Sequence, residues 1–318
     1  MSFLTALLNS MPGAFAQGLA WGIMAIGVYI TYKILDIADL TVDGSLGTGA
    51  AVCVLLTING VPIWAAMLCA VLAGMLAGLV TGLFHTVCGI PAILSGILTQ
   101  LALYSINLRI MGWGTKNGSQ SNLPISVDKY DLLVSSRFVR VLSRDNPIIP
   151  LVIFVVAVIA LLYWFFGTEL GASLRATGSN GNMSRAQGIN TNFTKVLGLM
   201  VSNGLVTLAG ALLAQYQGFS DVNMGRGAIV IGLAAVIIGE VIFSKVFINF
   251  ALKLLSCVFG AVIYYVVIQF VLRLGLSTDD LKLLTAVVVA IFLAVPYWKG
   301  RYFAKKVVPA GKGDNSNA

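Results

Sequence analysis

Residues 169–195 read Glu169-Leu-Gly-Ala-Ser-Leu-Arg-Ala-Thr-Gly-Ser-Asn-Gly-Asn-Met-Ser-Arg-Ala-Gln-Gly-Ile-Asn-Thr-Asn-Phe-Thr-Lys195 and lie between two long apolar runs. A polar connection between two runs of membrane-spanning length must lie at a membrane surface. Its glycines and asparagines disfavour a free-standing helix, yet Leu174 and Arg175, and then Met183 and Ala186, recur at helical spacing. The pattern predicts a short helix or a helix pair packed against something else, and so a segment that binds a partner.

The composition is that of a protein embedded in a membrane. Of 318 residues, 58% are hydrophobic and only 10% are charged, a balance that soluble domains do not show. No polar segment has the size of a domain, so we expect a single transmembrane domain over residues 1–318. The net charge of +8 is spread over loops and the C-terminal tail, which favours contacts with membrane lipid and argues against nucleic-acid binding.

Apolar runs long enough to cross a bilayer, about 20 residues each, define the expected architecture. They fall near residues 14–35, 62–84, 89–111, 147–167, 194–216, 248–272 and 281–298. Two further apolar helices, near 44–58 and 226–243, are short or interrupted by glycine. The expected fold class is therefore an all-α integral membrane protein with about 8–10 transmembrane helices, two of them broken or half-length.

The two short helices occupy matching places in an internal repeat. In each half, a full-length apolar helix runs into a polar segment, residues 36–43 or 215–226, and then into a glycine-rich apolar stretch. Polar backbone at membrane depth is tolerated where it lines a cavity, so paired broken helices indicate a transport pathway; the alternative is two ordinary interfacial turns. The residues expected to line the pathway are Asp39, Asp43, Ser45, Thr48, Gln215, Gln217, Phe219 and Asn223.

Three aspartates mark the first polar segment. Asp36, Asp39 and Asp43 are spaced three and four residues apart, which would place them on one face of a helix. Asp43 directly precedes Gly44, the start of the first short helix, and aspartate is a favoured helix N-cap. The aspartates either line the pathway or form an acidic interfacial turn with Asp43 as the cap, and in both cases they orient the broken helix.

The loops predict the orientation in the membrane. If segment 168–195 and the basic tail 299–318 are both cytoplasmic, an even number of spans must separate them, and the basic tail agrees with the positive-inside rule. Loop 112–146 then lies outside, although it also carries several basic residues. With this orientation, helices 14–35 and 194–216 run in opposite directions, so the repeat is inverted.

Three glycines lie on one face of the helix expected near 62–84. Gly74, Gly78 and Gly82 recur every four residues, and small residues at this spacing let another helix approach closely. We expect this face to pack against a helix of the same chain; a dimer interface is the alternative.

The chain lacks the motifs of an enzyme. It contains no phosphate-binding G-x-x-x-x-G-K-[ST] motif and no Rossmann glycine pattern in a strand–helix context, so it has no visible means of binding a nucleotide. Its single histidine, His85, cannot build a triad or a histidine-rich metal site, and its four cysteines lie in apolar runs without metal-site spacing. We expect no catalytic residues, no metal site and no cofactor bound by this chain.

The central segment also resembles a known family. Its pattern Leu-Gly-x-x-Leu-Arg-Ala-x-Gly-x-Asn, followed by Ala-x-Gly-Ile-Asn, is similar to the cytoplasmic coupling segment of ABC-importer permeases in the family that serves branched-chain amino acids and ribose. The similarity continues through 196–240 and, more loosely, in Asp-Leu-Thr-Val-Asp-Gly-Ser at 39–45. The residues that carry the match, and that the resemblance implies couple the chain to an ATPase, are Gly171, Leu174, Arg175, Ala176, Gly178, Asn180, Ala186, Gly188, Ile189 and Asn190.

The resemblance implies the transmembrane subunit of an ATP-binding cassette importer in a bacterial-type cell membrane, with an inverted-repeat permease fold. Its implied partners are a second permease copy, forming a homodimer, two ATPase subunits that hold ATP and Mg, and an extracytoplasmic solute-binding protein. The implied cargo is a small solute moved inward by alternating access, and segment 39–45 looks closer to a branch for amino acids, including aromatic ones. The alternative is an ion-coupled secondary transporter, which needs no ordered cytoplasmic docking segment.

Overall fold

The structure is a computed structural model that describes residues 3–115, 118–126, 129–130, 132–139, 146–243, 246–273 and short runs between 283 and 294. The described chain is mostly helical, with one short two-stranded ribbon. Its elements are α1 (Phe3–Tyr29), the π-helical turn η1 (Ile30–Ile34), α2 (Val42–Ile58), α3 (Ile63–Thr86), α4 (Ala92–Met111), β1 (Asn122–Pro124), the 3₁₀ turn η2 (Ser136–Phe138), α5 (Ile148–Gly167), α6 (Glu169–Ser179), α7 (Gly181–Ala186), α8 (Thr191–Gln217), β2 (Phe219–Asp221), α9 (Ala228–Phe243) and α10 (Phe250–Arg273).

The described residues contain six helices that are long and apolar enough to cross a membrane. These helices cover the spans expected near 14–35, 62–84, 89–111, 147–167, 194–216 and 248–272, and the shorter apolar helices α2 and α9 lie where half-length helices were expected. The span expected near 281–298 lies mostly outside the described residues, and tail 299–318 lies wholly outside them. The prediction of an all-α membrane fold with two half-length helices is confirmed.

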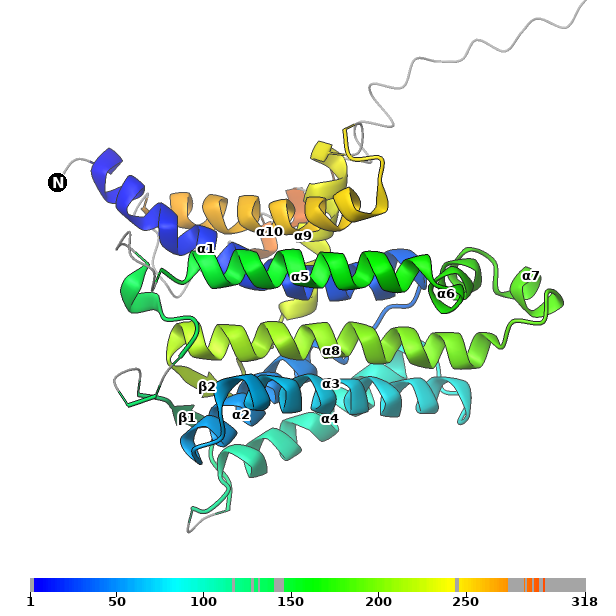
Figure 1. Ribbon diagram of the computed structural model, residues 1–318, viewed down its shortest axis with the longest axis horizontal. Coiled ribbons are helices and arrows are strands. Elements are labelled where there is room, and N and C mark those ends of the chain that lie inside the picture. Colours follow the sequence, from blue (N-terminus) through cyan, green and yellow to red (C-terminus); the bar gives the residue numbers. More distant parts are fainter. Residues whose placement is uncertain are drawn as a thin grey trace, which may run out of the picture.

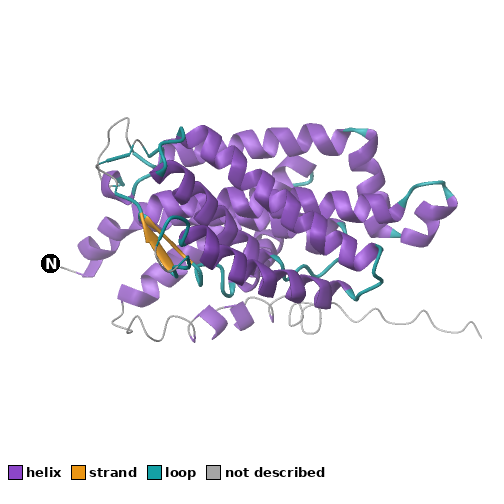
Figure 2. Ribbon diagram, turned by 90° about the horizontal axis from the view of Figure 1, so that it is seen from below, coloured by secondary structure: helices purple, strands orange, loops and turns teal. Residues whose placement is uncertain are grey.

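The two ends of the helix bundle carry different features. Figures 1 and 2 place α6 and α7 at one end, here called the coupling end, and β1, β2 and the N-terminus at the other, here called the ribbon end. Segment 168–195 and the described parts of loop 112–146 therefore lie at opposite ends of the molecule. The predicted orientation requires this separation.

The two halves of the repeat comprise α1–α3 and α8–α10. The first helix of each half packs against the third helix of the other half. α3 lies along α8, where a Cβ atom on Gly74, Gly78 or Gly82 would meet atoms of α8. In the same way α10 lies along α1, with Gly18 and Gly22 of α1 in contact with α10. This reciprocal arrangement fits an inverted repeat, and it assigns the α3 glycines to packing within the chain, as predicted.

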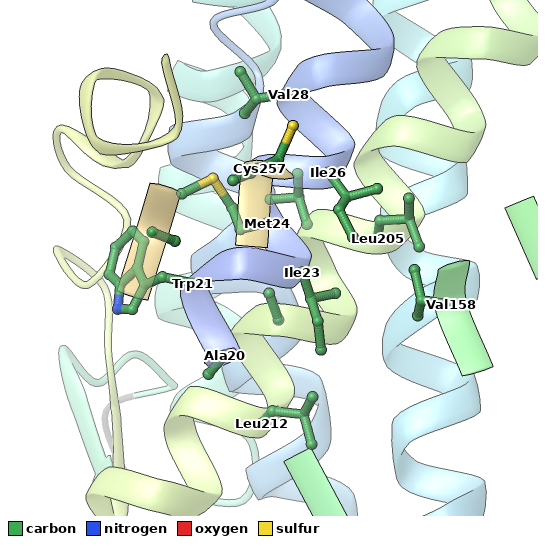
Figure 3. Close-up of a cluster of buried hydrophobic side chains, with 14 of the residues drawn as sticks. Ala20, Trp21, Ile23, Met24, Ile26, Val28, Val158, Leu205, Leu212 and Cys257 are labelled. Atoms are coloured by element: carbon green, nitrogen blue, oxygen red, sulfur yellow. The ribbon is translucent and has the colours of Figure 1, made fainter. Parts of the chain in front are cut away.

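The apolar core is built around α1. In the most apolar window of the span Ser10–Ile34, 78% of the residues are buried, against 22% in Ile148–Gly167, so α1 is central and α5 is peripheral. Figure 3 shows Ile23 and Ile26 of α1 among buried side chains of three other helices, including Val158, Leu205 and Cys257. A helix that is buried on most of its faces is apolar all round, which is why α1 shows no marked polar face.

A small antiparallel ribbon, which the sequence did not predict, closes the ribbon end. β1 pairs with β2 in the register Asn122 with Asp221, Leu123 with Ser220 and Pro124 with Phe219. The strands are three residues long, too short for an alternating pattern to be recognised in the sequence. The ribbon ties loop 112–146 to the polar segment that follows α8.

Candidate functional site

The first polar segment is an irregular connection and not a helix. α1 continues into η1, and residues 36–41 then run without helical structure to α2. Asp36 has φ of 54°, a left-handed conformation that stops a right-handed helix, and the Asp39 carboxylate accepts a hydrogen bond from the Thr41 N–H at 2.9 Å. The prediction that the three aspartates share a helix face is therefore wrong: Asp36 is exposed, whereas Asp39 is buried.

Asp39 is held by a polar network that reaches the other half of the repeat. Its Oδ2 atom accepts a hydrogen bond from Asn203 Nδ2 of α8 at 2.7 Å, and Asn203 Oδ1 accepts one from the Ser45 hydroxyl of α2 at 2.6 Å. Asp39, Asn203 and Ser45 are 1%, 0% and 0% exposed. Because buried polar groups are costly unless they are paired, this network fixes α2 and the preceding connection against α8.

A row of threonines extends the network to α3 and α4. The Thr41 hydroxyl lies 2.8 Å from the Thr81 hydroxyl, which in turn donates to Thr99 at 2.9 Å. All three side chains are buried. The connection before α2 is thus bound by side-chain hydrogen bonds to α8 and α3, and through Thr81 to α4.

Asp43 caps a helix, but not the one that the sequence indicated. α2 begins at Val42, so Asp43 already lies inside its first turn, and the N-cap position is held by Thr41, which makes no side-chain cap bond. The Asp43 carboxylate instead accepts hydrogen bonds from the backbone N–H groups of Gly227, at 3.0 Å, and Ile229, at 2.9 Å. A carboxylate at a helix N-terminus satisfies free N–H groups and complements the helix dipole, so Asp43 anchors the start of α9.

The second polar segment contains the same kind of side-chain-to-backbone hydrogen bond as the first. Asp221 accepts a hydrogen bond from the Asn223 N–H at 2.7 Å, as Asp39 does from Thr41 two residues on. A Cβ atom on Gly225 would meet the Asp43 carbonyl, so the two polar segments touch where α2 and α9 begin. The two half-length helices therefore start from one shared point inside the molecule.

The residues predicted to line a pathway fall into two groups. Asp39, Asp43 and Ser45 meet at the start of α2, and the buried Thr48 follows one turn later with its hydroxyl bonded to the Gly44 carbonyl. The second group lies towards the ribbon end. It comprises Gln215, which accepts a hydrogen bond from the Leu133 N–H at 3.3 Å, Gln217 at the end of α8, Phe219 in β2 and the exposed Asn223.

Asn203 is the important residue that the sequence analysis missed. It lies inside a long apolar helix, α8, with its side chain fully buried between Asp39 and Ser45. An amide in the middle of a membrane-spanning helix normally faces the protein interior, and this was the signal that could have identified it.

The predicted helix pair is present at the coupling end. α6 and α7 follow one another, and each helix start is capped by a side chain. Thr168 accepts from the Gly171 N–H, Asn180 accepts from the Met183 N–H at 3.0 Å, and Asn190 accepts from two N–H groups at the start of α8. The asparagines that disfavour a helix interior thus act as caps between three successive helices.

Tight packing holds α6 against the ends of the membrane helices. Leu174 is fully buried, and Cβ atoms on Gly171 and Gly178 would meet the backbones of α5 and η1 respectively. Arg175 Nη2 donates to the Phe166 carbonyl at 2.6 Å, and its guanidinium lies 5.7 Å from the centre of the Phe250 ring. Gly171, Leu174, Arg175 and Gly178 of the predicted coupling set therefore position the segment.

The rest of the predicted coupling set completes the turns or faces outwards. Ala176 is partly buried, and Ile189 donates its N–H to the Ser184 carbonyl at 3.0 Å. Gly188 has φ of 81°, a conformation that favours glycine, in the turn between α7 and α8. Ala186 is exposed, and so are Met183 of α7, at 53%, and Phe193 of α8, at 55%.

Comparisons with known proteins agree with this architecture. A family model described as the permease component of branched-chain amino acid transport systems matches residues 11–296. The chain is 42% identical to a tyrosine transport system permease protein of Clostridioides difficile over 90% of this chain and 91% of that protein. It is 33% identical to an uncharacterised protein of Rickettsia prowazekii over 90% and 98% of the two chains. The solved structure of PsaBC from Streptococcus pneumoniae in complex with Fab has a similar fold, with a TM-score of 0.50, 16% identity and 95% of each chain covered.

Proposed function

Because the chain belongs to the family of permease components of branched-chain amino acid transport systems, we propose that it is the transmembrane subunit of an ATP-binding cassette importer for an amino acid. It is a multi-pass membrane protein of a bacterial transport system. The finer proposal is carried by one observation: an ordered, doubly capped helix pair, α6 and α7, presents Met183 outwards at the coupling end. An ion-coupled carrier has no need of such a surface.

The contacts around α6 suggest how an ATPase could act on the pathway. Gly178 of α6 lies against the Ile34 carbonyl of η1, and η1 leads directly into the connection that contains Asp39. The π-helical turn is held by the bond from Leu35 N–H to the Ile30 carbonyl at 3.0 Å, an irregularity that often marks a functional point in a helix. A displacement of α6 would therefore be transmitted to the connection between α1 and α2 through direct contacts. Alternating access is the motion that we propose results from it.

The proposed pathway lies where the two half-length helices start. There Asp39, Ser45 and Asn203 form a buried polar network, and Asp43 joins α2 to the start of α9. Half-length helices that start deep inside a membrane protein bring helix ends and polar backbone groups together, and such groups suit a zwitterionic solute. The proposed pathway also includes Thr48, Gln215, Gln217, Phe219 and Asn223.

An amino acid is the proposed cargo because of the relatives. A tyrosine transport permease shares 42% of aligned residues over 90% of this chain, so an aromatic amino acid is the first candidate. The proposed assembly contains a second permease copy as a homodimer, two ATPase subunits that hold ATP and Mg, and an extracytoplasmic solute-binding protein that selects the cargo.

The coupling surface can be tested at Met183. Met183→Glu places a charge in the proposed apolar contact with the ATPase, and burying an unpaired charge is costly, so ATPase copurification and ATP-driven uptake should both fall about tenfold or more. Met183→Leu keeps the apolar area and should leave both near the level of the original chain. Because Met183 is more than half exposed, neither change should alter thermal unfolding of the isolated permease.

Copurification measured together with thermal unfolding distinguishes a loss of docking from a loss of folding. Arg175 and Gly178 are unsuitable for this test, because both contact other parts of the same chain and their replacement would disturb α6 itself. If the Met183→Glu protein is inserted and stable and still copurifies with the ATPase at the original yield, α7 is not part of the docking surface.

A further inference from the structure

A basic cavity opens at the coupling end, outside the proposed pathway. It has a volume of about 590 Å³ and lies among the end of α1, η1, α6 and the start of α10. Its lining includes Lys33, Arg175 and Lys253, together with Tyr29, Ile248 and Phe250. A second cavity of about 400 Å³ adjoins it and shares Arg175 and Phe250 in its lining; the two cavities together are here called the hollow.

Among the described residues, one of the three basic side chains in this hollow is paired with an acidic side chain. Lys33 Nζ lies 2.9 Å from an Oε atom of Glu240, and within the described residues this is the one salt bridge recorded for the three cations. Arg175 is held by the Phe166 carbonyl and the Phe250 ring, neither of which neutralises its charge. The lining thus carries three positive side chains, of which Lys33 pairs with Glu240, so the hollow favours an anion.

The surroundings of the hollow are those of a membrane interface. It lies where three membrane-spanning helices end or begin: Ser10–Ile34 and Ile148–Gly167 end there, and Phe250–Leu272 begins there. Its lining includes exposed apolar and aromatic side chains, with Ile248 77% exposed and Tyr163 of α5 59% exposed. Aromatic residues at span ends mark the depth of lipid head groups in membrane proteins.

We propose that this hollow binds the phosphate head group of an anionic phospholipid, with the acyl chains lying along its exposed apolar side chains. Lys33, Arg175 and Lys253 supply the positive charge, as basic pockets between membrane helices do for anionic lipids. The exposed Ile248 beside the basic lining favours an amphipathic ligand over a free anion. A free amino acid fits less well, because its ammonium group needs an acidic partner and Glu240 already pairs with Lys33.

The proposal is tested with the purified full-length chain in a neutral detergent. Phosphatidylglycerol, phosphatidylcholine and inorganic phosphate are titrated separately, and bound lipid is measured by native mass spectrometry. Phosphatidylglycerol should bind tightest, and the double variant Lys33→Gln/Lys253→Gln should weaken its binding by about 30-fold, the combined contribution of two basic residues beside an anionic lipid. Glu240→Gln removes the competing acid and should strengthen it by about fivefold.

A matched control removes two positive charges at the same end of the molecule but outside the hollow. Arg185, which donates to Thr191, and Lys195, which lies beside His85, serve for this purpose. The Arg185→Gln/Lys195→Gln protein should bind phosphatidylglycerol like the original chain. Equal binding of the two lipids, equal losses in the two double variants, or inorganic phosphate binding as tightly as phosphatidylglycerol would each overturn the proposal. If the Lys33→Gln/Lys253→Gln protein fails to fold, the tighter phosphatidylglycerol binding expected for Glu240→Gln still tests the proposal.

Discussion

Asp39→Leu should abolish transport and lower the free energy of unfolding by about 2–6 kcal/mol. Asp39→Asn should retain most of the transport activity and most of the stability. Leucine removes the acceptor of two buried donors, the Thr41 N–H and Asn203 Nδ2. A buried donor left without a partner costs about 1–3 kcal/mol. Because Asn203 also positions Ser45, we expect the network at the start of α2 to collapse.

Asparagine at position 39 can rebuild most of this network. Its amide oxygen can still accept from the Thr41 N–H, and its NH₂ group can face the Asn203 side chain. If the Asn203 amide turns over, its oxygen accepts from that NH₂ group and its own NH₂ donates to the Ser45 hydroxyl, which can accept as well as donate. The turn costs the hydrogen bond that Asn203 Nδ2 donates to the Leu199 carbonyl. We therefore expect a loss in stability below about 2 kcal/mol.

The pair of Asp39 variants also separates two mechanisms. In an ion-coupled carrier a buried carboxylate binds and releases a cation, so its neutralisation abolishes transport even in a folded protein. In the proposed importer, Asp39 releases no ion and acts through the hydrogen bonds that it accepts, which asparagine can largely keep. Thermal unfolding in detergent together with uptake into proteoliposomes measures both properties. An inactive Asp39→Asn protein with unchanged thermal unfolding would favour the ion-coupled carrier.

Gly78→Leu should prevent stable packing of the bundle. A Cβ atom at Gly78 would meet the backbone of Leu199 and Met200 in α8, and backbone atoms cannot rotate away as a side chain can. Overpacking a protein core costs about 1–3 kcal/mol, and we expect Gly78→Ala to lie in that range and Gly78→Leu to exceed it. The control is Val80→Leu on the same helix, where the side chain is 40% exposed and an added methylene has room.

Thermal unfolding of the three detergent-purified variants checks this order. The expected sequence of stability is Val80→Leu, which unfolds like the original chain, then Gly78→Ala, then Gly78→Leu. A Gly78→Leu protein as stable as the Val80→Leu protein would show that α3 and α8 do not pack through the glycine face.

Features that depend on local sequence were predictable. The apolar spans follow from length and hydrophobicity, and the pair α6 and α7 follows from helical spacing interrupted by residues that cap helices. The glycine face of α3 was identified from its spacing of four residues, because small residues there serve close helix contacts regardless of which helix is the partner.

Features that depend on partners far apart in the sequence were not predictable. Asp43 has the local context of a cap for α2, yet the N–H groups that it binds belong to residues 184 and 186 positions further on. Asn203 meets Asp39 across 164 positions, and nothing next to it in the sequence indicates that contact. The strands β1 and β2 are also far apart in the sequence and too short to show an alternating pattern.

The central claim is that ATP drives this permease through the coupling end. The most direct measurement reconstitutes the permease with the ATPase subunit that copurifies with it and a solute-binding protein loaded with an amino acid, and follows uptake while ionophores collapse the Na⁺ and H⁺ gradients. Uptake should require ATP at the ATPase and continue unchanged without ion gradients. Loss of uptake on collapse of either gradient at constant ATP would contradict the account.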